Sequence, residues 1–168
     1  FVDELFDLFS ENSKDHFSYK KKEISCNYFW EDGTRLSAFS DKNKFAKEVE
    51  KKLGVPTFRL LKYLKKAEKK YDLTKTIFLE KSLHKLSTFL NKDTLKAILN
   101  LNIFQIGKSL NDVNEKELIE PHLIQLYNRF ATYNGSSPYK TPGMMTLIQH
   151  LEQEYGTYVV ENGMIDIT

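Results

Sequence analysis

The sequence has few of the residues that build a self-contained metal or redox site. Its one cysteine, Cys26, has no second thiol with which to form a disulfide inside the chain. The four histidines are spread so widely that no two of them, and none with Cys26, could share a helical turn as metal ligands. We therefore expect no internal disulfide and no metal site. A single thiol fits a reducing, cytoplasmic environment.

Two longer features are also missing. There is no Gly-x-Gly-x-x-Gly or other phosphate-binding loop before a helix, so we expect the chain by itself to hold no dinucleotide. No apolar run approaches the ~18–20 residues that cross a bilayer. The chain starts at Phe1 without an initiator Met or a signal peptide, inside a helical pattern, and stops at Thr168 soon after a turn. These ends predict an internal segment of a longer protein.

The charge is nearly balanced overall but unevenly distributed. A net charge of +2 over 168 residues excludes a dominant polyanionic partner, whereas residues 42–70 carry eleven Lys and Arg against three acids. Three interpretations are open for this basic stretch: a solvated helix face, attraction to an anionic membrane surface, and nucleic-acid binding. Its aromatic residues fall on the apolar stripe and not among the lysines, and no nucleic-acid motif is present. We therefore expect a peripheral membrane contact and no nucleic acid.

Periodicity predicts an α+β fold that is mostly helical, with a small antiparallel sheet near residues 17–39. Residues 2–9 have helical spacing, residues 17–30 alternate between apolar and polar, and a Glu-Asp-Gly turn precedes an extended run at 34–39. Ser40 is a candidate N-cap for a helix that Gly54 ends. Pro56 then opens a helix whose predicted apolar stripe is Phe58, Leu61, Leu64, Ala67 and Tyr71.

The second half predicts shorter helices joined by clear breaks. Helical spacing recurs over residues 83–90, 93–106, 110–118, 121–130 and 144–155, and a short strand follows at 157–160. The helix near 93–106 has a wide apolar surface. It is either a buried core helix, an apolar wall for a long ligand, or a face that dips into a bilayer.

Residues 133–142 form a distinct stretch in which Gly, Pro, Ser and aromatic residues gather between two helices. Pro138 and Pro142 each disfavour helix at the residue before them, and Gly135 takes a positive φ without cost. The pattern predicts a fixed, irregular elbow, with an ordinary interhelical loop as the alternative.

The elbow and its flanks resemble the carotenoid desaturases of the phytoene-desaturase type, which are FAD-dependent members of the amine-oxidase superfamily. The resemblance is carried by Arg129–Pro142, by the apolar helix from Met144 to Tyr155, by Asn162-Gly163-Met164, and, earlier, by Tyr28–Thr34 and Phe45–Glu50. It implies FAD in the full-length protein and an apolar carotenoid or other isoprenoid as substrate. It also implies that this chain is the substrate-binding, membrane-facing part, without the flavin-binding Rossmann portion and inactive when isolated.

The resemblance implies site residues as well. The turn Asn162, Gly163 and Met164 would return the chain toward the flavin. The substrate-chamber candidates are Ile103, Phe104, Phe130, Tyr133, Gly135, Pro138, Tyr139, Met144, Leu147 and Ile148. Arg129 and His150 are candidates for orienting or proton-handling roles, or for hydrogen bonds that anchor the elbow, and no catalytic residue is assigned.

The isolated chain has one further expected property and two rival functions. We expect it to self-associate, or to bind lipids and dyes, through apolar surface between Ile98 and Leu151. Action on another isoprenoid is the alternative within enzymes, and a non-catalytic lipid-binding or protein-interaction module is the alternative outside them.

Overall fold

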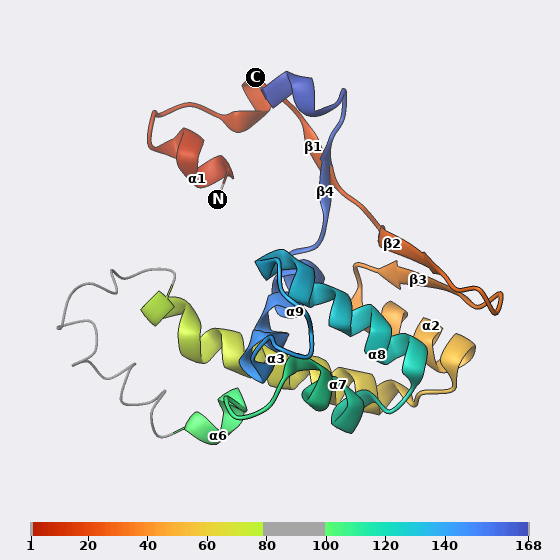
Figure 1. The fold of residues 1–168 in the computed structure, drawn as a ribbon. Coiled ribbons are helices and arrows are strands. Elements are labelled where there is room, and N and C mark those ends of the chain that lie inside the picture. Colours follow the sequence, from red (N-terminus) through yellow and green to blue (C-terminus); the bar gives the residue numbers. More distant parts are fainter. Residues whose placement is uncertain (1, 79–99, 168) are drawn as a thin grey trace.

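The computed structural model describes residues 2–78 and 100–167 and shows a helical body with a protruding arm (Figure 1). The predicted helix at 83–90 and the first half of that at 93–106 lie outside the described residues. The strands are β1 (Tyr19–Lys21), β2 (Ile24–Phe29), β3 (Arg35–Phe39) and β4 (Tyr158–Val160). The α-helices are α1 (Val2–Asp7), α2 (Lys42–Leu53), α3 (Thr57–Phe78), α6 (Leu101–Phe104), α7 (Leu110–Leu118), α8 (Pro121–Asn128) and α9 (Ile148–His150). Shorter turns of 3-10 or π geometry are η1 (Ser13–Asp15), η2 (Arg129–Asn134), η3 (Gly143–Leu147), η4 (Leu151–Tyr155) and η5 (Met164–Ile167).

The strands form two separate antiparallel pairs. β2 and β3 make the predicted hairpin, with Phe29 opposite Arg35 and Ile24 opposite Phe39, which confirms the small sheet. β1 does not join this hairpin. It pairs with β4 near the other end of the chain, Tyr19 lying opposite Val160. This pairing could not be predicted from the sequence, because neither strand contains a local feature that indicates a partner so far along the chain.

The helix α2 begins one residue later than its pattern suggested. Asp41, and not Ser40, is the N-cap, and its carboxylate accepts a hydrogen bond of 2.7 Å from the Lys44 amide. The Ser40 hydroxyl instead bonds the Lys22 carbonyl. Gly54, in left-handed conformation, ends the helix as predicted.

The long helix α3 buries a stripe that differs from the predicted one at its start. Leu60, Leu64, Ala67 and Tyr71 are buried, whereas Phe58 is 68 % exposed. At 100° per residue, position 58 lies opposite the centre of that buried stripe. The sequence pattern placed Phe58, the larger apolar side chain of the first turn, in the buried stripe, whereas Leu60 fills this position.

The core lies where the hairpin, α2, α3 and α8 meet. Its largest fully buried side chains include Phe45, Tyr127 and Phe130, and the hairpin contributes Leu36. Burying a side chain of this size contributes roughly 1.5–3 kcal/mol to stability. Among the helices that the structure describes, none is long and apolar enough to cross a membrane.

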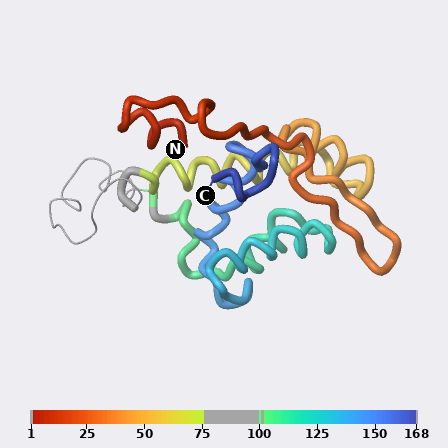
Figure 2. The backbone as a smooth tube through the Cα atoms, turned by 90° about the horizontal axis from the view of Figure 1, so that it is seen from above, coloured from red at the N-terminus to blue at the C-terminus, as the bar shows by residue number. Residues whose placement is uncertain are grey.

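The arm consists of β1 and β4 together with α1 and η5. Figure 1 shows that it stands off the helical body and carries both chain ends, and Figure 2 gives the view from above the arm. Neither α1 nor η5 contains a buried residue. Gly156 joins the body to β4 with φ +85° and ψ −177°, a conformation that is nearly exclusive to glycine. The Lys21 side chain lies over it, where a Cβ would stand.

Candidate functional site

The predicted elbow, residues 133–142, is hydrogen-bonded to the start of α7. The amide of Leu110 donates to the Thr141 carbonyl at 2.7 Å, and the amide of Asn111 donates to the Pro138 carbonyl at 3.1 Å. First-turn amides have no partner inside their own helix, so these elbow carbonyls satisfy them. Gly135 has the expected positive φ of 59°. The elbow is therefore irregular, as predicted, and tied to α7 by backbone hydrogen bonds.

The elbow also packs closely at its far end, where Gly143 begins η3. A Cβ on this glycine would lie 2.6 Å from Val113 Cγ2 and 3.2 Å from the carbonyl oxygens of Gln105 and Lys108. Its amide donates to the Lys108 carbonyl at 2.7 Å. Only glycine lets the two backbones approach this closely.

Arg129 and Tyr133 converge on one carboxylate. Arg129 Nη2 lies 3.3 Å from both oxygens of Glu152, and the Tyr133 hydroxyl donates to Glu152 at 3.0 Å. The guanidinium also lies 4.8 Å from the centroid of the Phe130 ring. Arg129 thus anchors the start of the elbow to η4. Glu152 escaped sequence reasoning because a glutamate among polar neighbours on a helix gives no sign of its partner.

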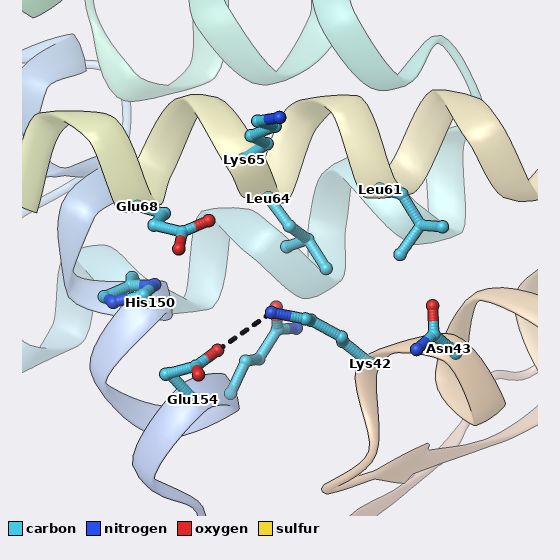
Figure 3. Close-up of a pocket in the computed structure, with 9 residues that line it drawn as sticks. Lys42, Asn43, Leu61, Leu64, Lys65, Glu68, His150 and Glu154 are labelled. Carbon is cyan, nitrogen blue, oxygen red and sulfur yellow. Dashed lines mark hydrogen bonds and ion pairs between the residues drawn. The ribbon is translucent and has the colours of Figure 1, made fainter.

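His150, the other polar candidate, lines a groove of about 400 Å³ between α2, α3 and η4 (Figure 3). Lys42 Nζ and Glu154 Oε2 are 3.1 Å apart across it, and this hydrogen bond raises the pKa of Lys42. Glu68 and His150 lie beside each other at one end, and the His150 ring is 5.0 Å from that of Tyr71. The groove is lined by Lys42, Asn43, Leu61, Leu64, Lys65, Glu68, His150, Gln153 and Glu154. This mixed charge suits a small polar group better than a polyene.

A buried amide network joins four helices beneath the elbow. The Tyr63 hydroxyl lies 2.5 Å from Asn114 Oδ1 and 2.9 Å from Gln149 Oε1, and Asn114 Nδ2 donates to Asn128 at 2.9 Å. Tyr63, Asn114 and Gln149 are almost completely buried, and burial raises the pKa of Tyr63. The sequence does contain a signal for this network, because Asn111 and Asn114 interrupt the apolar face of α7 at helical spacing.

A buried lysine is the second feature that sequence reasoning missed. Lys70 is 3 % exposed, and its ammonium donates to Thr146 Oγ1, Gln105 Oε1 and the Gly143 carbonyl at 2.6, 2.8 and 3.1 Å. Burial lowers the pKa of Lys70 to about 8. Lys70 therefore does not belong to the predicted basic surface of residues 42–70.

The structure separates the chamber candidates into three environments. Phe104 is buried with Met144 packed against it, while Phe130 lies in the main core and Ile148 packs on that core. Tyr133, Gly135 and Tyr139 are exposed, and Ile103, Pro138 and Leu147 are half-buried. None of them lines the groove of Figure 3. A common chamber formed by these residues therefore stays a prediction, as does self-association through Ile103, Phe104, Met144 and Leu147.

The candidate flavin turn lies on the arm. Asn162 and Gly163 follow β4, Gly163 has φ +105°, and Met164 is 70 % exposed at the edge of an apolar groove of about 660 Å³. An added Cβ on Gly163 would meet nothing within 4 Å, so this turn leaves room for a group to approach its backbone. The placement of this turn beside FAD stays a prediction. Within residues 2–78 and 100–167, no three His, Cys, Asp or Glu side chains are grouped as metal ligands.

Comparison with known proteins gives relatives over nearly the whole chain. It is 47 % identical over 163 residues to 1-hydroxycarotenoid 3,4-desaturase of Flavobacterium sp. (strain P99-3), a match that covers 97 % of this chain and 33 % of the relative. It is 26 % identical over 162 residues to 4,4'-diapolycopene oxygenase of Methylomonas sp. It is 25 % identical over 134 residues to 4,4'-diapolycopen-4-al dehydrogenase of Metabacillus indicus.

These matches share one pattern of coverage. The chain spans between 27 and 33 % of the length of these curated relatives. No family model matches the sequence.

Proposed function

We propose that this chain, which belongs as a segment to the carotenoid desaturase-type family, is the substrate-binding part of an FAD-dependent enzyme that dehydrogenates carbon–carbon bonds of an apolar polyene. The 47 % identity to 1-hydroxycarotenoid 3,4-desaturase over 97 % of the chain carries this proposal. The more distant relatives are named for oxidation of other polyenes, which supports the same class of substrate.

The chemistry divides naturally between this chain and the remainder of the protein. Desaturation removes two hydrogens from neighbouring carbons, one as hydride and one as a proton, and FAD supplies the hydride acceptor when bound. This chain would bind the polyene, orient it and exclude water. An apolar substrate offers no hydrogen bond, so its selection rests on the shape and length of the apolar surface that receives it.

We also propose that the full-length protein is peripheral to a membrane and meets it through the basic helices α2 and α3. Several exposed lysines there, among them Lys47, Lys51, Lys62, Lys65 and Lys69, have no carboxylate partner among the described residues. Lys62, Lys65 and Lys69 share the outer face of α3 with the exposed Phe58, at spacings of one, two and three turns from it. Cations beside an exposed aromatic ring suit an anionic bilayer surface.

The test is an activity assay on the full-length protein with flavin bound. The protein would be supplied with phytoene, with more desaturated carotenes and with a 1-hydroxycarotenoid. The products would be identified by mass and by visible absorbance. Loss of two hydrogens with a red-shifted spectrum supports the proposal. A gain of oxygen would place the protein with the oxygenases instead. Turnover of a different isoprenoid alone would support the alternative substrate. Absence of both turnover and a flavin spectrum would favour a non-catalytic lipid-binding module.

A second measurement addresses the division of labour. We expect the isolated chain to be inactive and to bind no FAD, since it lacks a phosphate-binding loop. A fluorescence titration of the isolated chain with FAD checks this, and saturable binding at micromolar concentration would contradict it.

A further inference from the structure

A continuous row of aromatic rings runs along the arm. The rings of Phe6 and Phe17 have centroids 6.0 Å apart, those of Phe17 and Tyr19 are 6.0 Å apart, and those of Tyr19 and Tyr158 are 5.7 Å apart. The row crosses from α1 over β1 to β4, so it joins residues from both ends of the chain. Strand pairing of Tyr19 with Val160 and of Lys21 with Tyr158 fixes the register of the last contact.

These rings line the apolar groove of about 660 Å³. Aliphatic side chains complete its walls, including Val2, Leu5, Val160 and Ile167. Val2, Leu5, Tyr158 and Ile167 are between 37 and 49 % exposed, so this surface is open to solvent in the chain alone. A groove with mainly apolar walls is typical of a ligand site.

Several polar side chains beside the row have partners on the arm, and two of the residues that line the groove, His16 and Asp166, are polar. The Tyr19 hydroxyl donates to Asp3 at 2.7 Å, and the second oxygen of Asp3 accepts from Ser13 at 2.5 Å. His16 Nε2 lies 2.6 Å from Glu11. Ring faces and aliphatic side chains make up most of the lining, which suits a ligand that is mainly apolar.

We infer that this groove, lined by Phe6, Phe17, Tyr19 and Tyr158, binds a conjugated polyene along its row of rings. The inference rests on the proposed function, because it locates the substrate surface of that same enzyme. A polyene is long, flat and apolar, and its π-system can contact successive ring faces and edges along the row. The names of the relatives supply the chemical class of the occupant. Met164, the last residue of the candidate flavin turn, is among the residues that line the groove.

The test measures lycopene binding to the full-length flavin-loaded protein, read from the circular dichroism induced in the visible bands of the polyene. Tyr158→Lys places an ammonium in the groove and should raise the Kd by about tenfold or more, since an unpaired charge is costly to bury. Tyr158→Phe keeps the ring and should stay within about twofold of the wild type. Phe6→Lys, on a helix without buried residues, gives a second disrupting variant that does not disturb strand pairing.

A matched control lies on the helical body. Phe29→Lys introduces the same charge at a ring that is 69 % exposed on the hairpin, outside the groove. It should leave lycopene binding unchanged. Flavin absorbance and the thermal midpoint of each variant report whether the protein is folded.

The outcomes separate this inference from the function it rests on. Weaker binding in both lysine variants, with Phe29→Lys unchanged, supports the groove. If the wild type binds lycopene and both groove variants bind it equally well, the groove inference is overturned while the proposed function stands. A lower thermal midpoint with unchanged lycopene binding also overturns it, because another part of the protein then covers these rings. A wild type that neither binds lycopene nor converts any carotenoid overturns both.

Discussion

The Lys70 ammonium lies 2.6 Å from the Thr146 hydroxyl, and both side chains are buried. This contact ties the middle of α3 to η3 just beyond the elbow. All three acceptors of Lys70 are neutral, so no carboxylate compensates for the loss of hydration. Keeping Lys70 charged in the folded protein therefore lowers the free energy of unfolding, and the size of this penalty depends on pH.

The first prediction concerns this pH dependence. Because the folded pKa of Lys70 is about 8 and its ordinary value is 10.5, the unfolded chain holds the proton more tightly. Between these values the unfolded state binds more protons, so Lys70 makes the free energy of unfolding rise with pH, by at most about 3 kcal/mol. Urea unfolding from pH 7 to 10 should show this rise in the wild type relative to Lys70→Met. The exposed neighbour Lys69→Met is the control and should show no such difference. If the free energy of unfolding changed with pH in the same way in the wild type and in Lys70→Met, the prediction would be wrong.

The second prediction concerns the close approach at the end of the elbow. Gly143→Ala would press a methyl group against Val113 and two carbonyl oxygens, and should lower the free energy of unfolding by about 1–3 kcal/mol. Gly107→Ala is the matched control, since an added Cβ there meets nothing within 4 Å and its φ is not positive. It should change stability by no more than about 1 kcal/mol. Equal midpoints in urea for the two variants would show that η3 moves freely to make room.

The elbow shows what the sequence can predict and where it fails. Its break in periodicity, its prolines and Gly135 are local features, so both its position and its irregular backbone could be predicted. The partners of its flanking residues could not be. Arg129 meets Glu152, and Lys70 reaches Thr146, through contacts that depend on the packing of separate helices.

The helices and hairpin illustrate the same limit. Helical periods, Gly54 and the turn before Thr34 predicted α2, α3, α7, α8 and the hairpin. Propensity misplaced Phe58 because a large apolar residue near a helix start is read as core, whereas Leu60 fills that place. The pairing of β1 with β4 was equally hidden, since it depends on how the arm folds back on itself.

The third prediction tests the buried amide network. Tyr63→Phe removes the hydroxyl that both Asn114 and Gln149 contact, leaving buried polar atoms without a partner. The free energy of unfolding should fall by about 1–3 kcal/mol. Tyr139→Phe removes a hydroxyl from a ring that is 70 % exposed and should be neutral. Urea unfolding measures both, and a neutral Tyr63→Phe would mean that water replaces the hydroxyl.

The fourth prediction concerns His122, which lies between two carboxylates at the join of the hairpin and α8. Its Nδ1 is 2.8 Å from Glu120 and its Nε2 is 2.9 Å from Asp32, and the hydrogen bond with Glu120 is the largest cause of its raised pKa. A raised histidine pKa stabilises the fold fully below the unfolded pKa of about 6.5, and this stabilisation is lost as pH rises through the folded pKa. The stability advantage of the wild type over His122→Gln should therefore shrink as pH rises above 6.5. NMR titration of the imidazole should show a larger fall in pKa for Glu120→Gln than for Asp32→Asn, and the reverse order would be inconsistent with this geometry.

The fifth prediction tests the membrane-facing surface of α3 in the full-length protein. Lys62, Lys65 and Lys69 lie on its outer face, and each lysine held near an anionic surface contributes about 1 kcal/mol. Lys66 is left unchanged because its ammonium pairs with Glu117 at 2.6 Å, so its reversal would disturb packing as well as charge. Reversing the three lysines to Glu should reduce flotation with anionic liposomes. Added salt should lower the flotation of the wild type toward that of the variant, because salt screens the charges.

Reversal of Lys108, Lys116 and Lys140 is the control. It makes the same change in net charge at exposed positions on other elements and should reduce flotation less. Phe58→Ser should weaken flotation at high salt as well, because its contribution is apolar. Equal flotation of the two triple variants would leave the basic face of α3 as a solvated helix surface.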